Sequence, residues 1–430
     1  MAKLTGFSAI RSAFANRNFR LYTSGNVCSH VGTWVQRIAV GWLTWQLTKS
    51  AFWLGVMSMA DLLPAVLLAP LAGAVADRVE RIQAIKVTQA LAMVQAITLA
   101  ILTWTGLITI EILLGLTFFL GIVMAFNQPL RLATIPSLVE RKDMPAAISI
   151  NSLSFNGSRV VGPAIAGVVI EYFGIAPCFA LNAATFVAFQ VALFMLGAGQ
   201  KDRPTGAKPI GNIPLEIMEG VLYCARHVGI APMIVMVAFT AVLGRAYAEL
   251  LPGFADEVFG YGADGLAMLT SSMGAGAVIG GAIMAGRGTL DGLTTVVIRG
   301  VFVLGVSVLA FTISPSIWAA MVCIACSGYA AVTCSVGQQT LLQSAMSPTM
   351  RGRVMSLYGM IARAGPALGA LAMGAASEVF GLRWPVVVGA ALVLLVWLWL
   401  RPRRERLAEV LEREPVLDAE EHPPEPAPTR

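Results

Sequence analysis

The chain has 430 residues, of which 57% are hydrophobic and 13% are charged, and its mean hydropathy is +0.74. A water-soluble fold of this length could not cover so much apolar surface, so the composition excludes a soluble globular protein and indicates an integral membrane protein. The net charge of +6 does not predict nucleic-acid binding, because the basic residues follow membrane topology and can meet anionic lipid.

About a dozen apolar stretches are long enough to cross a hydrocarbon core of ~30 Å as helices. Short breaks with Gly, Pro or charge separate them, and no segment alternates apolar and polar residues as a β-barrel strand does. We therefore predict an all-α integral membrane protein with twelve transmembrane helices. The spans are placed near 20–47, 51–76, 83–105, 108–131, 146–173, 176–199, 228–253, 263–286, 291–313, 315–340, 352–380 and 383–400.

The residues before the first span lack the apolar core and small-residue cleavage site of a secretory signal, so we expect no removable signal peptide. If the N-terminus is cytoplasmic and the spans alternate, 24 of the 30 basic residues lie in inner segments or the C-terminal tail. The outer loops hold only Lys49 and Arg383, and the loop "GFADEVFGYGADG" at 253–265 is purely acidic. The positive-inside rule thus predicts a multi-pass protein of the inner (plasma) membrane with both termini in the cytoplasm.

The break after the second span reads "GAVADRVER" at 73–81, and Gly73, Asp77, Arg78 and Arg81 have the spacing GxxxDRxxR. A plain positively charged loop would explain the arginines but not the glycine and the aspartate. The glycine permits close approach of two helices, and the carboxylate can hold basic groups or a facing helix N-terminus. The motif resembles the signature after the second helix of the major facilitator superfamily, which implies a cytoplasmic gate.

In the fifth span, "GPAIAG" contains Gly162, Pro163 and Gly167, which would allow a helix bend and close packing. The segment partly resembles the glycine and proline signature of the superfamily's antiporters, but it lacks the full glycine spacing. The strings "GTWVQR", "FNQPLRLATIPSLV" and "RGRVMSLYG" are similar to the branch with enterobactin-type siderophore exporters and macrolide efflux proteins. This resemblance implies export.

An internal repeat divides the chain. The stretch "RVVGPAIAGVVIEYFGIAP" at 159–177 shares R, GP, G, E and FG in order with "RAGPALGALAMGAASEVFGLRWP" at 363–385. The resemblance implies two six-helix, pseudo-symmetric halves with substrate between them near the midplane. We expect an N-terminal half at 1–199, a cytoplasmic linker at 200–227, a C-terminal half at 228–400 and a cytoplasmic tail at 401–430. The tail is rich in Pro and Glu, and we expect it to be largely disordered. The disorder is expected beyond about residue 412.

Once the 26 cations of the loops, the tail and the membrane interface are set aside, four basic residues remain inside predicted spans, namely Arg37, Arg159, Arg245 and Arg363. Arg37 and Arg245 are 208 positions apart, and Arg159 and Arg363 are 204 apart, so the four form two repeat-related pairs. An arginine at the membrane centre costs roughly 2.5 to 3.5 kcal/mol, so each needs a partner. They are either structural clamps between helices or contacts for substrate or coupled charge.

We predict an ion pair between Arg37 and Asp61, which lie at similar depth. Glu249 follows Arg245 by four residues, so these two could pair on one helix face. Arg159 and Arg363 have no acid at matching depth and are free for an anionic or carbonyl-rich substrate. Asp61 is our first candidate for a proton carrier and Glu249 the second, while Asn127 and Gln338 are candidates for lining a cavity.

These features predict a secondary active transporter that exports an amphiphilic small molecule of the drug or siderophore class by alternating access, with proton antiport. An importer, or a lipid or metabolite transporter of the same fold, is the alternative. The sequence has no catalytic constellation, nucleotide-binding loop or clustered metal ligands, so we expect no enzyme activity, no cofactor and no metal site. Expected partners are the substrate, protons and lipid, and we expect a monomer.

Overall fold

The computed structural model describes residues 7–76, 78–196, 213–287, 289–346 and 350–412. Every regular element in these ranges is helical. The first group of helices comprises α1 (Phe7–Ala15), α2 (Arg17–Thr48), α3 (Ala51–Leu67), α4 (Ala69–Ala76), α5 (Arg81–Trp104), α6 (Ile110–Thr134), η1 (Ile135–Leu138), α7 (Met144–Phe173) and α8 (Ala176–Phe194).

The later helices include one segment that changes helical type several times. They are α9 (Ile213–Arg226), α10 (Ile230–Phe239), η2 (Thr240–Gly244), η3 (Ala246–Leu250), α11 (Leu251–Gly253), η4 (Phe254–Val258), α12 (Gly262–Arg287), α13 (Leu293–Ile313), α14 (Ile317–Ala345), α15 (Arg351–Phe380), α16 (Arg383–Leu400), η5 (Arg401–Arg403) and α17 (Arg404–Leu411). Elements η2 and η4 are π-helical, and η3 is a 3₁₀-helix.

Ten helical segments in the described ranges are long and apolar enough to span a membrane. The other two predicted spans correspond to α2, which has 32 residues but many polar ones, and to the broken pair α3 and α4. The break at Leu68 leaves α3 with only 17 residues. Many apolar side chains on the outside of the bundle are exposed, including Trp104, Leu67 and Val379, as expected where lipid replaces water.

Local sequence explains where several helices begin and end. The side chain of Asn16 accepts hydrogen bonds from the backbone N–H groups of Asn18 and Phe19, which caps α2. Helices α7 and α15 end at Gly174 and Gly381, whose φ angles are 85° and 76°. Only glycine adopts such angles without strain. These are the glycines of the repeated "FG", so the sequence repeat coincides with a repeated helix end.

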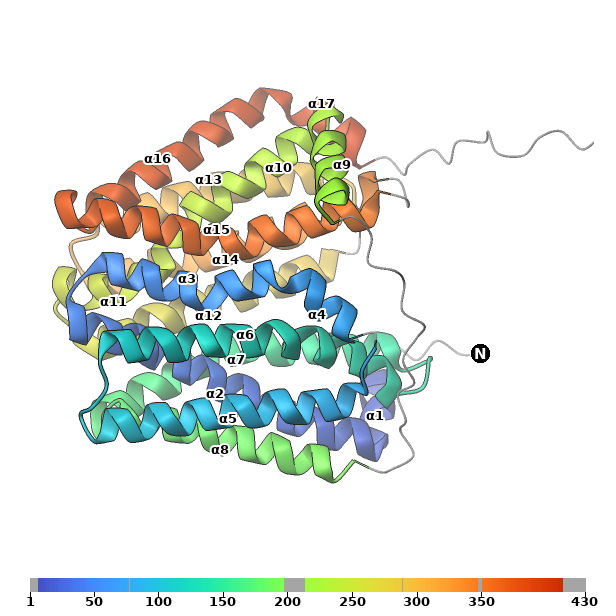
Figure 1. The fold of residues 1–430 in the computed structure, drawn as a ribbon. Helices are drawn as coiled ribbons and strands as arrows, with labels where there is room; N and C mark the ends of the chain where they lie inside the picture. The colour runs from blue at the N-terminus through green and yellow to red at the C-terminus, as the bar shows by residue number, and fades with distance from the viewer. Residues whose placement is uncertain (1–6, 77, 197–212, 288, 347–349, 413–430) are drawn as a thin grey trace, which may run out of the picture.

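Figure 1 shows the helices running side by side, with the early helices in its lower part and the late ones in its upper part. Helices α2, α5, α6, α7 and α8 pack on one another, and so do α12, α13, α14 and α16. We call the helices up to α8 the first group and the later helices the second group. The main contacts between the two groups join α3 to α15 and α7 to α12. We call the end that holds Phe7 and Glu412 the termini end, and the end with the turns at 49–50 and 381–382 the opposite end.

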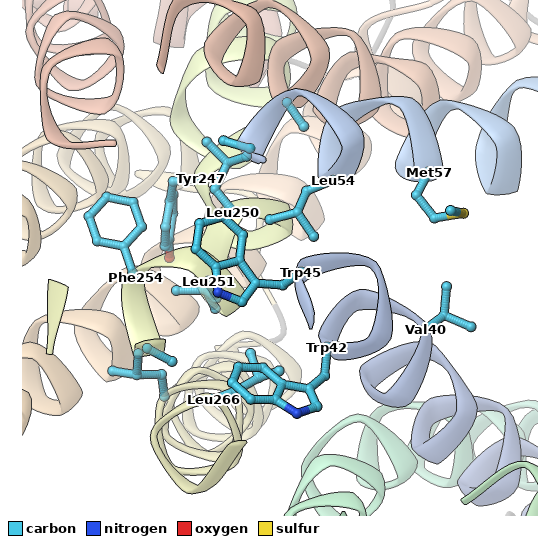
Figure 2. Close-up of a cluster of buried hydrophobic side chains, with 14 of the residues drawn as sticks. Val40, Trp42, Trp45, Leu54, Met57, Tyr247, Leu250, Leu251, Phe254 and Leu266 are labelled. Carbon is cyan, nitrogen blue, oxygen red and sulfur yellow. The ribbon is translucent and has the colours of Figure 1, made fainter. Parts of the chain in front are cut away.

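The two groups of helices are in tight contact at the opposite end. A large apolar cluster there combines Trp45 and Leu54 from the early helices with Leu250 and Phe254 from the late ones (Figure 2). A Cβ atom added to Gly374 of α15 would lie 2.8 Å from the backbone carbon of Ala51. The backbones therefore touch, and there is no room for a side chain between them.

The same helices separate toward the termini end. A Cβ added at Gly73 of α4, Gly157 of α7, Gly286 of α12 or Gly359 of α15 would meet no described atom within 4 Å. The bundle is therefore closed at the opposite end, and the close backbone contact found there is not repeated at these four positions.

Candidate functional site

An ion triad lies inside the bundle and joins three helical elements. Arg37 of α2 donates hydrogen bonds to Asp61 of α3 at 2.7 Å and to Glu249 of η3 at 2.8 Å. The exposed fractions of these side chains are 32%, 28% and 24%, so water can reach all three. The predicted pair of Arg37 with Asp61 is confirmed. Because one arginine faces two carboxylates, the triad carries one uncompensated negative charge.

The expected pairing of Glu249 with Arg245 is wrong. That expectation required a regular α-helix, in which residues four apart share a face. The segment is instead π-helical at 240–244 and 3₁₀-helical at 246–250, which turns Glu249 away from Arg245 and toward α2. Arg245 has only a long contact of 3.5 Å to the Ser335 hydroxyl.

Arg159 of α7 stacks on an aromatic ring. Its guanidinium carbon lies 5.4 Å from the centroid of Trp34, and that of Arg37 lies 5.6 Å from the same ring. Such cation–π contacts stabilise a desolvated guanidinium by roughly 2 kcal/mol or more. Within the described residues, Arg159 has no hydrogen bond and no ion pair.

Arg245 and Gln338 line a small cavity between η2, α13, α14 and α15. Its polar lining also includes Thr240, Ser335 and Tyr358. Gln338 is only 3% exposed, and its Nε2 atom has no partner among the described residues.

Arg363 of α15 is exposed and reaches across to a helix of the first group. Its Nη1 donates a hydrogen bond of 2.9 Å to the side-chain oxygen of Gln128 in α6. This is a neutral partner, so the charge of Arg363 is not compensated there. The sequence analysis did not identify Gln128, although it lies next to the candidate Asn127.

Asn127 lies between helices of the first group. It is 1% exposed and donates a hydrogen bond of 2.7 Å to the Thr88 hydroxyl of α5, while its own oxygen has no partner in the described chain. A role for Asn127 in a substrate cavity stays a prediction.

The gate motif is only partly described, because Asp77 lies outside the described residues. Arg78 is exposed, and Arg81 donates a hydrogen bond of 3.3 Å to the carbonyl oxygen of Ala133 at the end of α6. The close helix approach that we expect at Gly73 is not made, since the position faces open space.

The glycines of "GPAIAG" lie at two close helix contacts. A Cβ on Gly162 would clash with the Cβ of Trp34 in α2, and one on Gly167 would clash with that of Ala267 in α12. Close packing is therefore required at both positions. Helix α7 continues through the buried Pro163.

The sequence analysis missed a buried arginine. Arg131 was counted as a loop cation, but it lies in α6 and is 7% exposed. It donates hydrogen bonds to Asn26 at 2.9 Å, Ser29 at 3.0 Å and Gln89 at 2.7 Å. Polar residues at these positions in two neighbouring apolar spans were the signal that could have located it.

Two acidic residues at the opposite end connect the late helices to the α2–α3 turn. Asp256 accepts hydrogen bonds from Lys49 at 2.5 Å and from the Trp45 indole at 2.7 Å. Glu378 accepts hydrogen bonds from the Ser50 hydroxyl at 2.6 Å and from the backbone N–H of Phe52 at 3.2 Å. These links close the bundle at the end away from the termini. In the described ranges, no three His, Cys, Asp or Glu side chains come together as metal ligands.

Comparison with known proteins identifies relatives along nearly the whole chain. The family model described as "transmembrane secretion effector", a family of the major facilitator superfamily, matches residues 8–426. The chain is 23% identical to the staphyloferrin A transporter of Staphylococcus aureus over 364 residues, which cover 84% of this chain and 90% of the relative. It is 26% identical to the enterobactin exporter EntS of Salmonella paratyphi A, with 90% and 92% covered.

Macrolide efflux protein A of Streptococcus pyogenes is 20% identical, and the match covers 89% of this chain and 95% of that protein. Among solved structures, a mutant of the peptide transporter POT matches with a TM-score of 0.75 and 13% identity, covering 95% of this chain and all of the other. A bacterial homologue of the human lysosomal transporter Spinster, in an inward-facing and unoccupied conformation, matches with a TM-score of 0.71 and 14% identity, covering 96% and 100%. At these identities the structures show the shared fold alone.

Proposed function

We propose a function from one premise, that the chain belongs to the transmembrane secretion effector family of the major facilitator superfamily and is a membrane transporter. We infer that it exports an amphiphilic small molecule, of the drug or siderophore class, by proton antiport. Relatives named as a siderophore exporter and as macrolide efflux proteins support this direction and this class.

The proposal includes a topology of twelve spans in two six-helix halves. The ten apolar helices supply ten spans, and α2 and the α3–α4 pair supply the other two. The excess of Lys and Arg in one set of loops supports a cytoplasmic termini end and an insertion into the inner membrane. With this orientation, the described conformation is closed to the outside.

The ion triad of Arg37, Asp61 and Glu249 is the observation that carries the proposal. It contains the one ion pair within the membrane-embedded part of the described chain that joins the two halves, from α2 to η3. Alternating access requires the halves to separate on the outer side, and this movement breaks the pair of Arg37 with Glu249. The state of the triad and the state of the transporter are therefore linked.

Proton coupling follows from the charges of the triad. Two carboxylates share one guanidinium, so one of them can bind a proton without leaving an unpaired arginine. When the outer side opens, Glu249 loses its arginine and can take a proton from outside. When the outer side closes, Arg37 approaches again and favours release of that proton to the cytoplasm. Asp61 stays beside Arg37 in the same half, so the geometry favours Glu249 over Asp61 as the carrier.

Reconstituted vesicles of known orientation test this function. With an imposed pH gradient, we expect gradient-dependent efflux of at least one compound from a panel of siderophores, macrolides and amphiphilic dyes. Glu249→Gln and Asp61→Asn should each abolish the dependence on the gradient. Glu171→Gln is the matched control, because Glu171 lies exposed at the outer end of α7 and outside the triad.

Import, or movement of a lipid or another metabolite, is the alternative within the same fold. Net flux in the opposite direction under the same gradient would support it and contradict export. Gradient-dependent efflux that survives in both triad variants would contradict our assignment of the coupling residues.

A further inference from the structure

The membrane-embedded part of the described chain holds more positive than negative charge. Asp61 and Glu249 both bind Arg37, and this leaves Arg159 and Arg245 without a carboxylate. An unpaired charge in a poorly hydrated site is unfavourable, so such sites attract a counter-ion.

Arg245 follows η2, and its one side-chain hydrogen bond within the described chain is the long contact of 3.5 Å to the Ser335 hydroxyl. Its side chain is partly exposed, so a ligand can reach it.

The cavity beside Arg245 provides a second hydrogen-bond donor. The Nε2 group of Gln338 is buried in its lining and has no partner in the described chain. The Tyr358 hydroxyl is already committed to the carbonyl oxygen of Ser335, and the Thr240 hydroxyl to that of Met236. The donors that remain for a ligand are therefore the Arg245 guanidinium, the Gln338 amide and the Ser335 hydroxyl, which accepts from Arg245.

The geometry points to a carboxylate-binding subsite formed by Arg245 and Gln338, which deepens the proposed function because it assigns an anionic head to the exported molecule. The cavity offers about 10 Å³ to the centre of a water molecule, the space of one water. A single carboxylate oxygen fits there, bound by Arg245 and Gln338. The planar guanidinium group of Arg245 matches the planar shape of a carboxylate.

Benzoate and benzamide test this subsite, because they differ in little but the charged group. We would measure the thermal unfolding midpoint of the purified full-length protein in detergent while titrating each compound at constant ionic strength. Ligands that bind the folded state raise this midpoint in a saturable way. Benzoate should do so, and benzamide should bind at least about tenfold more weakly, as expected for loss of a hydrogen-bonded charge.

Arg245→Gln should weaken benzoate binding by about tenfold or more. Arg245→Lys keeps the charge and should retain part of the affinity, which distinguishes the subsite from a folding defect. Arg383→Gln is the matched control, since Arg383 lies exposed at the start of α16, outside the cavity. Unfolding midpoints without ligand report whether each variant is folded.

Equal stabilisation by benzoate and benzamide would overturn the inference, and so would a benzoate effect that the Arg245→Gln variant retains. Stronger stabilisation by inorganic phosphate than by benzoate would overturn the carboxylate assignment in favour of a tetrahedral anion. The assay involves no transport. Gradient-driven efflux without a benzoate effect would thus leave the proposed function intact, and a benzoate effect without efflux would leave the subsite intact.

Discussion

Arg131 brings a positive charge into the first group of helices without a carboxylate partner in the described chain. Its two terminal nitrogens donate to Asn26, Ser29 and Gln89, and its guanidinium also lies 4.7 Å from the ring centroid of Phe189. A planar fork presents its donors from separate nitrogens and so matches three acceptors on two helices, whereas an ammonium group must serve all of them from a single nitrogen.

We predict that Arg131→Lys destabilises the protein more than Arg131→Met. Lysine keeps the energetic cost of a buried charge and loses part of the hydrogen bonding. Methionine removes the charge, and its only cost is that the polar acceptors lose their donor. A buried acceptor without its donor costs about 1–3 kcal/mol. Thermal unfolding in detergent measures the order, and the opposite order would show that charge, more than hydrogen-bond geometry, is what this site requires.

His227 acts as a cap for α10. Its Nδ1 atom accepts hydrogen bonds from the backbone N–H groups of Gly229 and Ile230, both at 3.2 Å. Only the neutral ring can accept in this way. Burial lowers the pKa of His227 from its ordinary value of 6.5, so the unfolded chain binds a proton more readily than the folded chain.

The contribution of His227 to stability is therefore complete above pH 6.5 and is lost as the pH falls below this value. We predict that the wild type loses more stability than His227→Asn between pH 7.5 and pH 5.5, because asparagine can cap the helix but does not titrate. Loss of such a cap costs about 1 kcal/mol. Thermal unfolding at both pH values checks the difference, and parallel pH profiles would exclude the cap.

The C-terminal helix α17 shows what the sequence predicts at the scale of an element and what it does not. The composition of the tail suggested disorder, beyond about residue 412, and residues 413–430 lie outside the described chain. Residues 401–411 form η5 and α17, and Leu407 and Leu411 are buried in an apolar cluster with side chains of α10, α14 and α15, among them Ile230, Leu341 and Val354. Two apolar residues four apart are a weak signal in a charged segment, so packing on the bundle could not be foreseen.

Glu412 couples α17 to the start of α13. Its carboxylate accepts hydrogen bonds of 2.7 Å from the backbone N–H groups of both Gly292 and Thr294. A carboxylate at a helix N-terminus binds free N–H groups and interacts favourably with the helix dipole. We predict that Glu412→Ala lowers the free energy of unfolding by about 1 kcal/mol.

Glu409→Ala is the control for this element, because Glu409 is exposed on the same helix and has no interaction with another described residue. Chemical or thermal unfolding in detergent measures both variants. Equal effects would mean that the substitution acts through the charge or helix propensity of α17 and not through the cap on α13.

The segment 240–258 marks the limit of sequence reasoning about the site. Its hydropathy predicted a span, and a span exists there, but the pairing of Glu249 depended on a regular helix. The π and 3₁₀ turns redirect Arg245 and Glu249 toward different neighbours. Such turns depend on tertiary packing and leave no periodic signal, whereas the pair of Arg37 with Asp61 followed from depth in two neighbouring spans, which the sequence does provide.

At the scale of the whole molecule, the family and the all-helical membrane fold followed from composition, spacing and motifs. The conformation, that is, which end of the bundle is closed, did not follow from the sequence. The same contacts must form and break in a transporter, and the sequence encodes both states. In the described state, Gly374 and Gly55 let α15 and α3 touch at the opposite end. Asp256 and Glu378 hold the same end with polar links.

This arrangement predicts that bulk at Gly374 opens the closed end. A Cβ there would lie 2.8 Å from the backbone carbon of Ala51, and overpacking of this kind costs about 1–3 kcal/mol. Gly374→Val should therefore shift the population toward the state open at the opposite end by about fivefold or more. A cysteine at Leu54, buried between the two groups of helices, reports the shift when the native cysteines are replaced.

The rate of thiol labelling at Leu54→Cys should rise by the same factor in the valine variant. Gly115→Val in α6 is the matched control, since an added Cβ there meets no described atom within 4 Å. The smaller Gly374→Ala should give an intermediate rate, because its Cβ meets the same backbone with less bulk behind it. An unchanged labelling rate in a folded Gly374→Val protein would mean that the closed end adjusts locally to the larger side chain. The contact between α3 and α15 would then not determine which side of the transporter is open.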